Sequence, residues 1–445
     1  MHLLYISLEF VLPVNNGHRM RMWSVLEALA AEGHEVTFVS LAEEPDLSVD
    51  LQPLRQICHR VELVPHTLYR LADSANYLGR LRAFLSFGAY GTRRFVSAAM
   101  KSRIGTCLRD ENPGALICDT VFAAVNLPAT DIPLVINNPD VEHTILQRYV
   151  EFERNPIKRL YARLEARKVK QWEAKICRRA TVCMACSEKD RQILAALAPE
   201  TYATLVPNVV DTRSYEPSYE TTSRCVLFQG GMDWFPNRDA VKFFVTQIFP
   251  LLRQDLPDVE FIAAGRNPSP EMLAEFLQVP GVKFTGTVPD MRPYLEQAAV
   301  CAVPLRIGSG TRLKILEAAA AGKAIVSTRL GAEGLDFEDG TEILLADEPQ
   351  EFAAALKSLL REPARRRAIG EAARRRVREQ YSYATLQDSL RRAFALLTRR
   401  QLTTEATCGA PRARQDVFVG DAVSRERLRE REGALETDVK RPCKG

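Results

Sequence analysis

Residues 304–335 read PLRIGSGTRLKILEAAAAGKAIVSTRLGAEGL, and they decide how this chain is interpreted. An apolar run is followed by a loop that contains Gly308, Ser309 and Gly310, and a helical pattern begins near Thr311. Thr311 or Ser309 is placed to cap that helix. Glycines at a helix start let backbone N–H groups approach an anion, and the helix dipole favours negative charge there. The segment therefore predicts a phosphate-binding loop.

Three charged side chains follow on the same helix. Arg312 and Lys314 lie in its first turn, where cations oppose the dipole unless a bound anion offsets them. Glu317 can accept two hydroxyl hydrogen bonds, as from a ribose. Taken singly, each residue fits an ordinary solvated helix. Together with the glycine loop, they favour a nucleotide-binding site.

Strand and helix patterns alternate on both sides of this segment. The predicted strands of the first half lie at 3–8, 36–41, 114–118, 134–136 and 181–185. Those of the second half lie at 226–228, 259–264, 282–285, 300–304, 324–327 and 342–345. Two similar α/β series predict two Rossmann-like domains with parallel sheets that face each other across a cleft.

The predicted boundaries follow the change from one series to the next. Residues 1–205 are assigned to the first domain and residues 206–372 to the second. Residues 373–400 are expected to form a closing helix, and 401–445 a charged, disordered tail because large apolar residues are scarce there.

Composition narrows the class of protein. The 445 residues are 46% hydrophobic and 26% charged, which excludes disordered, collagen-like and disulfide-scaffold chains. Lys and Arg number 60 against 56 Asp and Glu, so a basic surface must come from local clustering. No apolar stretch approaches the ~20 residues of a membrane span. Ten irregularly spaced cysteines and no export signal predict a cytoplasmic protein with reduced thiols.

The 304–335 segment resembles the nucleotide-sugar site of family-4 retaining glycosyltransferases, also called group 1, which have the GT-B fold. Their motif is E-x7-E, then a small-residue helix, a glycine, a strand, and a further glycine shortly before a glutamate. Glu317 matches the second acid, and Gly331 and Glu333 match the end of the motif. Ser309 occupies the position of the first acid. The resemblance implies that Glu317 holds the ribose and that Ser309 or nearby backbone amides replace the residue contacting the donor sugar.

The resemblance extends over residues 1–398. GHEVT at 33–37 resembles the family's first helix-to-strand turn, and ACSEKD at 185–190 and VPN at 206–208 resemble its entry to the second domain. The charged helix at 374–378 resembles the closing helix, which in this fold crosses back to the first domain.

The resemblance also implies a set of donor-binding residues. The family places a glycine, an arginine and a lysine against the diphosphate, but this chain has Pro-Asn in place of the usual Lys-Gly. We therefore expect Arg312, Lys314 and Arg266 to meet the phosphate charge. In the first domain Arg19 is expected to face the cleft. The full donor-binding set is Gly17, Arg19, Gly230, Gly231, Asn237, Arg266, Gly308, Gly310, Thr311, Arg312, Lys314 and Glu317.

The acceptor side is expected after the strand at 134–136. Relatives often carry H-N-x-E here, and this chain has Pro139 at the position of the histidine. Asp140 and Glu142 match the rest and are predicted to line the acceptor side. His143 is a further candidate, although a lone histidine is more often structural. The predicted catalytic set is Glu317, Ser309, Asp140, Glu142 and His143.

Two basic segments bear on partners. Leu68–Arg103 interleaves arginines with aromatic residues, and Arg154–Arg179 carries ten Lys and Arg. Such segments suit an anionic membrane surface, but ordinary solvated helix faces have the same composition. No nucleic-acid motif is present.

The sequence thus predicts an enzyme that transfers a sugar from a UDP- or GDP-linked donor to a glycan or lipid-linked acceptor. Retention, no cofactor and no metal are implied by the resemblance, and the enzyme is expected at the inner face of the membrane. Two alternatives stay open at this point: a GT-B nucleotide-sugar epimerase and a non-catalytic GT-B binding protein.

Overall fold

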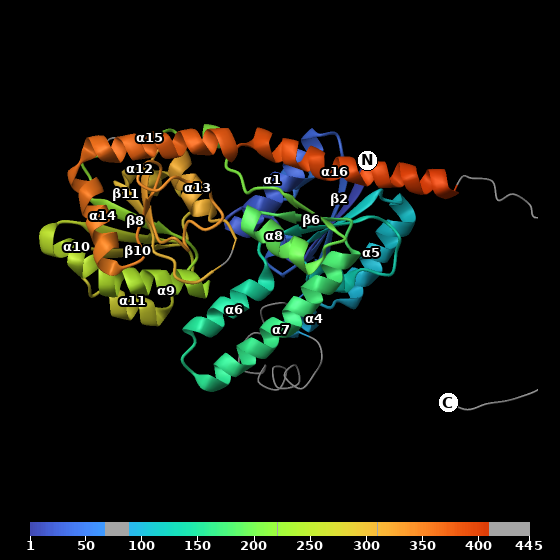
Figure 1. Ribbon diagram of the computed structural model, residues 1–445, viewed down its shortest axis with the longest axis horizontal. Coiled ribbons are helices and arrows are strands. Elements are labelled where there is room, and N and C mark those ends of the chain that lie inside the picture. The colour runs from blue at the N-terminus through green and yellow to red at the C-terminus, as the bar shows by residue number, and fades with distance from the viewer. Residues whose placement is uncertain (67–88, 220, 309, 409–445) are drawn as a thin grey trace, which may run out of the picture. The chain divides into compact units, whose positions relative to one another are not determined.

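Two parallel sheets organise the chain in the computed structural model, which describes residues 1–66, 89–219, 221–308 and 310–408 (Figure 1). The first sheet contains β1 (His2–Ser7), β2 (Glu35–Ala42), β3 (Arg60–Pro65), β4 (Ala115–Asp119), β5 (Leu134–Asn138), β6 (Val182–Ala185) and β7 (Tyr202–Leu205). The second contains β8 (Cys225–Gln229), β9 (Glu260–Ala264), β10 (Val282–Gly286), β11 (Val300–Val303), β12 (Ala324–Ser327) and β13 (Leu344–Leu345).

Strand order reverses once in each sheet. The first sheet runs β3-β2-β1-β4-β5-β6-β7 and the second β10-β9-β8-β11-β12-β13, with parallel neighbours throughout the described ladders. The reversal lies between β1 and β4 in one sheet and between β8 and β11 in the other. Ligands of open α/β sheets bind beyond the carboxyl ends of strands at such reversals.

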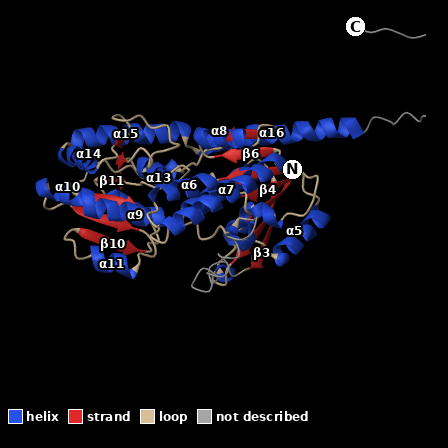
Figure 2. Ribbon diagram, turned by 60° about the horizontal axis from the view of Figure 1, so that its bottom comes forward, coloured by secondary structure: helices blue, strands red, loops and turns tan. Residues whose placement is uncertain are grey.

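Helices cover both faces of each sheet (Figure 2). Those that follow strands of the first sheet are α1 (Gly17–Ala31), α2 (Gln52–Ile57), α4 (Tyr90–Arg94), α5 (Ala98–Glu111), α6 (Glu142–Phe152), α7 (Pro156–Arg179) and α8 (Glu188–Leu197). Those of the second half are α9 (Phe235–Phe243), α10 (Phe249–Asp255), α11 (Pro270–Phe276), α12 (Arg292–Gln297), α13 (Leu313–Ala320), α14 (Pro349–Arg361), α15 (Pro363–Gln380) and α16 (Tyr383–Cys408). The predicted pair of Rossmann-like domains is confirmed.

Apolar packing explains why the strands read as near-continuous hydrophobic runs. The first sheet has a core on each face, because strands of a covered parallel sheet bury both sets of side chains. In the second domain Phe244 stacks on Phe261 with ring centroids 4.1 Å apart, and Phe352 packs edge-on against Phe244. Each buried aromatic ring of this kind contributes a large apolar area to the core.

The last two helices bridge the domains, as the sequence predicts. Ala373 and Val377 of α15 belong to the core of the second domain, whereas Leu390 and Phe394 of α16 belong to a core of the first. α16 continues to Cys408, so the predicted tail boundary after residue 400 falls inside a helix. The physical reason is that the first glycine or proline after Tyr383 is Gly409. The other domain boundaries stay predictions.

None of the described helices is long and apolar enough to span a membrane. β3 and β7 were not predicted, and both lie at edges of the first sheet.

Candidate active site

Glu317 lies at the strand-order reversal of the second sheet. The Tyr215 hydroxyl donates to Oε1 of Glu317 at 3.0 Å, and Nε2 of Gln229 donates to Oε2 at 2.8 Å. Burial raises the pKa of Glu317 to about 7, although the Tyr215 hydrogen bond and Lys314 oppose the rise. The carboxylate is therefore held in place by two side chains that the sequence analysis did not foresee.

Lys314 lies one turn before Glu317 and belongs to a second cluster of predicted residues. Its Nζ donates to Oδ1 of Asn237 at 2.9 Å and lies 4.2 Å from the centroid of the Phe228 ring. Burial, and then the neighbouring Arg312, lower the pKa of Lys314 to about 7. Asn237, which stands where relatives have a lysine and a glycine, thus positions the ammonium group.

Two glycines give this cluster its space. Nδ2 of Asn237 donates to the carbonyl of Gly231 at 2.8 Å. A Cβ at Gly230 would lie 2.9 Å from Nζ of Lys314 and 2.8 Å from Nδ2 of Asn237. Gly230, Gly231, Asn237 and Lys314 are therefore brought together, as expected for one anion-binding site.

The prediction that Thr311 caps α13 is wrong. The helix begins at Leu313, its N-cap is Arg312, and no side chain caps it. The Thr311 hydroxyl instead accepts a hydrogen bond of 2.6 Å from Nδ2 of Asn208, in the segment that links the sheets. Ser309 lies outside the described residues.

The segment 304–312, called the glycine loop below, contacts the first domain. Nη1 of Arg312 donates to the carbonyl of Gly310 at 2.6 Å, and Arg148 of α6 donates to the carbonyl of Gly308. Burial lowers the pKa of Arg312, and nearby Asp140 opposes this shift. Arg312 is thus placed between the glycine loop and the acceptor side.

Asp140 lies in the loop from β5 to α6, against the glycine loop, and Glu142 is the first residue of α6. A Cβ at Gly310 would lie 2.3 Å from Oδ1 of Asp140, and Gly310 has φ of +71°. Burial raises the pKa of Asp140 to about 7, and Arg312 opposes the rise. Burial and the Asp140 charge raise the pKa of Glu142 to about 8. The Asp140 carboxyl group therefore lies against the predicted donor side, and Glu142 lies close enough to Asp140 for their charges to interact.

The His143 imidazole contacts Glu173, which also binds the start of α6. Its Nδ1 lies 2.5 Å from Oε2 of Glu173 in α7, and the side chain is 3% exposed. The same carboxylate accepts the backbone N–H groups of Glu142 at 2.9 Å and His143 at 3.1 Å. Glu173 therefore caps α6 and holds the imidazole, while a catalytic role for His143 stays a prediction.

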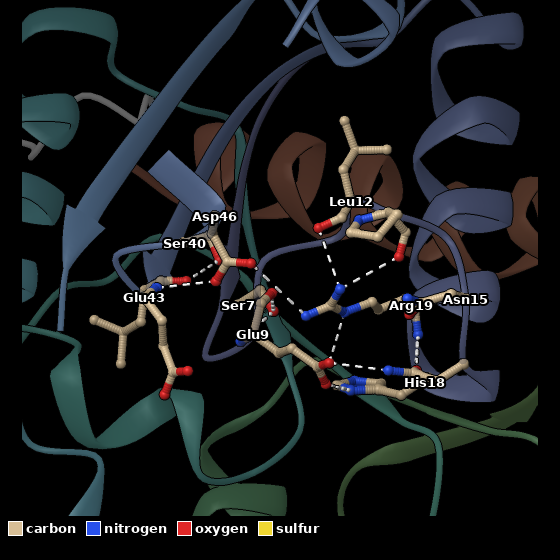
Figure 3. A network of polar contacts seen from close by, with 12 residues as sticks. Ser7, Glu9, Leu12, Asn15, His18, Arg19, Ser40, Glu43 and Asp46 are labelled. Carbon is tan, nitrogen blue, oxygen red and sulfur yellow. Dashed lines mark hydrogen bonds and ion pairs between the residues drawn. The ribbon is translucent and has the colours of Figure 1, made fainter. Parts of the chain in front are cut away.

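The loop from β1 to α1 contains a polar network that the sequence analysis did not foresee (Figure 3). Arg19 is engaged within it: Nε donates to Oε1 of Glu9 at 2.7 Å, and Nη1 donates to the carbonyl of Leu12 at 3.2 Å. Gly17 begins α1, and a Cβ there would lie 3.4 Å from Cδ1 of Leu313. Donor binding by Arg19 stays a prediction.

His18 lies between two carboxylates at the strand-order reversal of the first sheet. Its Nδ1 is 3.0 Å from Oε2 of Glu9, and its Nε2 is 2.6 Å from Oδ2 of buried Asp119. Burial alone would lower the pKa of His18, but Asp119 and Glu9 raise it well above the usual value. Burial likewise opposes the shift at Glu9, whose pKa His18 and Arg19 lower to about 2. His18 is thus held between two acids that favour its protonated form.

Hydrogen bonds connect this group to the glycine loop. Nδ2 of Asn137 donates to Oδ1 of Asp119 at 2.7 Å, and Nη2 of Arg21 donates to Oδ1 of Asn137 at 2.7 Å. Nη1 of Arg21 donates to Oδ1 of Asn208 at 2.9 Å, and Asn208 in turn donates to Thr311. The resemblance at 206–208 drew attention to Asn208, but it did not predict the hydrogen-bond partners of Asn208, which come from distant segments.

Arg266 lies where the two domains meet. Its Nε forms an ion pair of 3.0 Å with Oδ2 of Asp233, and its Nη1 donates to Oδ1 of Asn15 at 3.5 Å. The guanidinium thus lies beside the loops that follow β8 and β1, and its part in phosphate binding stays a prediction.

Comparison with known proteins identifies the family of the chain. Residues 15–214 match the family described as Glycosyltransferase Family 4, and residues 223–362 match the family described as Glycosyl transferases group 1. The chain belongs to the group 1 glycosyltransferases.

Curated and solved relatives are distant but cover most of the chain. An uncharacterized 44.6 kDa protein in the cps region of Klebsiella pneumoniae is 20% identical over 79% of this chain and 89% of its own. TarM superposes with a TM-score of 0.67 at 11% identity, covering 89% of this chain and 99% of TarM. Anabaena HepE in complex with UDP-glucose gives 0.61 at 14% identity, covering 91% and 100%. These likenesses show the GT-B fold.

Proposed function

We propose that this protein transfers a sugar from a nucleoside diphosphate to a glycan or lipid-linked acceptor, with retention at the anomeric carbon. The observation that carries the proposal is the Glu317 carboxylate, held by Tyr215 and Gln229 one helical turn from the Lys314–Asn237 pair. A carboxylate for ribose hydroxyls and a cation for phosphate are thereby fixed at the carboxyl ends of the strands.

Glu317 would accept hydrogen bonds from the two ribose hydroxyls, and Lys314 would contact the diphosphate. Arg312, Arg266 and the first N–H groups of α13 would add positive charge. In the transfer, the bond from the anomeric carbon to the phosphate oxygen breaks. The acceptor oxygen forms the new bond on the same face, and its proton passes to the departing diphosphate. Fixed cations can stabilise that leaving group without a metal ion or cofactor.

The acceptor would approach from the β5–α6 loop. With pKa values of about 7 and 8, Asp140 and Glu142 carry protons over part of the neutral range in the empty site. Protonated carboxyl groups can donate to sugar oxygens and do not repel an anionic substrate. The position of Asp140 against Gly310 supports a role for these two groups beside the sugar to be transferred.

Relatives support the donor and the pathway. HepE has been solved with UDP-glucose, and Staphylococcus aureus TarM with UDP and α-GlcNAc-glycerol. The Klebsiella relative lies in a cps region, which supports a role in polysaccharide or glycoconjugate synthesis. We propose a UDP- or GDP-linked donor and a site of action at the cytoplasmic face of a membrane.

A thermal-shift screen of nucleotide sugars tests the donor, because a tight ligand raises the melting temperature. The donor found is then incubated with the protein alone and followed by NMR. Slow hydrolysis to free sugar supports a transferase, an epimerised donor identifies an epimerase, and binding without turnover identifies a binding protein. The anomeric signal of a glycosylated acceptor decides between retention and inversion.

A further inference from the structure

α6 and α7 form a hairpin that extends from the acceptor side of the site (Figure 1). At its turn, three large apolar side chains are exposed: Phe152 by 46%, Ile157 by 79% and Leu160 by 54%. Gathered apolar side chains on a polar surface mark an interaction site. They make no contribution to the site described above.

Basic residues outnumber acids around these side chains: Arg154, Lys158, Arg159 and Arg163 are exposed, against the exposed Glu151 and the half-buried Glu153. α7 contains nine Lys and Arg, and its two acids, Glu165 and Glu173, are both buried. The outward face of α7 is therefore basic along its length, and Lys158, Arg159 and Arg163 are exposed beside the apolar side chains. Apolar side chains framed by cations are typical of helices that bind anionic membrane surfaces.

We propose that the hairpin tip, residues 152–163, docks on an anionic lipid surface. Phe152, Ile157 and Leu160 enter the headgroup region, and Lys158, Arg159 and Arg163 face the lipid phosphates. A soluble polyanion such as a nucleic acid would use the charges and leave the apolar side chains in water. The inference rests on the proposed function in one respect: docking of the hairpin on lipid would bring a lipid-linked acceptor to the site.

The base of the hairpin is built into the site. α6 begins at Glu142, and the Glu173 carboxylate of α7 holds the first N–H groups of α6. Nη2 of Arg148, in the middle of α6, lies 2.6 Å from Oε2 of Glu333, and Arg148 also donates to the carbonyl of Gly308. A surface bound at the tip is therefore connected through one helix to the acceptor carboxyl groups and the glycine loop.

Vesicle co-sedimentation of the full chain tests the proposal. Wild-type protein is expected to bind vesicles rich in phosphatidylglycerol and not phosphatidylcholine vesicles. Ile157→Ser with Leu160→Ser, and separately Lys158→Glu with Arg159→Glu, are each expected to reduce the partition coefficient about tenfold or more.

Matched controls carry the same changes on the second domain. Leu277→Ser removes an apolar side chain that is 50% exposed, and Arg375→Glu with Arg378→Glu reverses two exposed charges of α15. Both controls are expected to bind vesicles like the wild type.

Three results would overturn the proposal. They are no vesicle binding by the wild type, normal vesicle binding by the tip variants, or vesicle binding that is lost on charge reversal but kept on apolar replacement. The last result identifies a purely electrostatic contact in which the apolar side chains do not enter the lipid. Donor-induced thermal shifts, measured on the same proteins, keep the two proposals apart. Normal donor shifts without vesicle binding reject only the hairpin, and vesicle binding without any donor shift rejects only the transferase.

Discussion

The side-chain amide of Asn208 donates a hydrogen bond of 2.6 Å to the hydroxyl of Thr311 and so ties the segment between the sheets to the glycine loop. Asn208 is itself held by Arg21, and all three residues are buried. Buried donors are costly to leave unpaired, so this link is expected to contribute to stability as well as to loop position.

Thr311→Val should lower the free energy of unfolding by about 1–3 kcal/mol, because Asn208 loses its acceptor at nearly constant side-chain volume. Urea unfolding measures the change, and Thr311→Ser, which keeps the hydroxyl, serves as the control. The coupling is checked with Asn208→Ala in a double-mutant cycle, in which strictly additive effects would contradict the link.

Glu317→Gln is expected to weaken donor binding and to stabilise the empty protein above neutral pH. The folded-state pKa of about 7 exceeds the usual 4.5, so the folded state binds more protons between these values. The carboxylate therefore costs stability as pH rises through that window, and glutamine does not. A higher melting temperature near pH 8, with no difference near pH 4, is the expected result. Unchanged donor affinity would contradict the ribose assignment.

Lys314→Met is expected to abolish proton uptake on donor binding. Because the pKa of Lys314 is about 7, much of this lysine is neutral at about pH 8 and must gain a proton beside the diphosphate. Donor affinity should thus fall as pH rises above about 7. Calorimetry in two buffers of different ionisation heat measures the uptake, and equal uptake by the variant would rule out Lys314 as its source.

Gly310→Ala should impair transfer far more than a matched glycine replacement. The new Cβ would meet Oδ1 of Asp140 at 2.3 Å and the carbonyl of Pro139 at 2.8 Å. Gly286 has a similar φ, +67° against +71°, but a Cβ at that position would have no atom within 4 Å. Both replacements incur a backbone cost of about 1 kcal/mol, so only Gly310→Ala should raise the KM for donor or acceptor. Equal kinetics of the two variants would contradict the contact.

His18→Gln should cost more stability in acid than in alkali. The folded-state pKa of His18 is raised by Asp119 and Glu9, so the imidazolium stabilises the fold fully below its usual pKa of about 6.5. That contribution is lost as pH rises through the folded-state value. Unfolding free energies of wild type and variant at about pH 6 and pH 10 measure the difference, and a gap independent of pH would argue against the charged form.

Most of the fold could be predicted because central parallel strands are continuous apolar runs. β3 escaped prediction since it is an edge strand in which Arg60 and Glu62 pair with each other and Arg60 also pairs with Glu111. β7 is a four-residue edge strand whose Tyr202 is 47% exposed. Neither strand has the buried side chains that produce a clear pattern.

The part of the site that is local in sequence could also be predicted, as Lys314 and Glu317 show. The pairing of His18 with Asp119 could not, because Asp119 lies 101 residues away and only the β1–β4 pairing brings it near. The prediction that Thr311 caps α13 failed for a related reason. A hydroxyl just before a helix predicts an N-cap, but the Thr311 hydroxyl accepts a hydrogen bond from the distant Asn208 instead. Which hydrogen bond a side chain forms depends on partners that are distant in sequence, and a single sequence does not show which distant residues come together.

The ion pair of Arg148 with Glu333 has a consequence for engineering. Under the proposed function the first domain receives the acceptor, so exchanging it between relatives is a route to new acceptor choice, with the junction in the segment between the two sheets. Such a chimera would combine Arg148 of one parent with the glycine loop and residue 333 of the other. A hybrid enzyme should therefore carry residues 304–335 from the same parent as α6, with the junctions placed within the second domain.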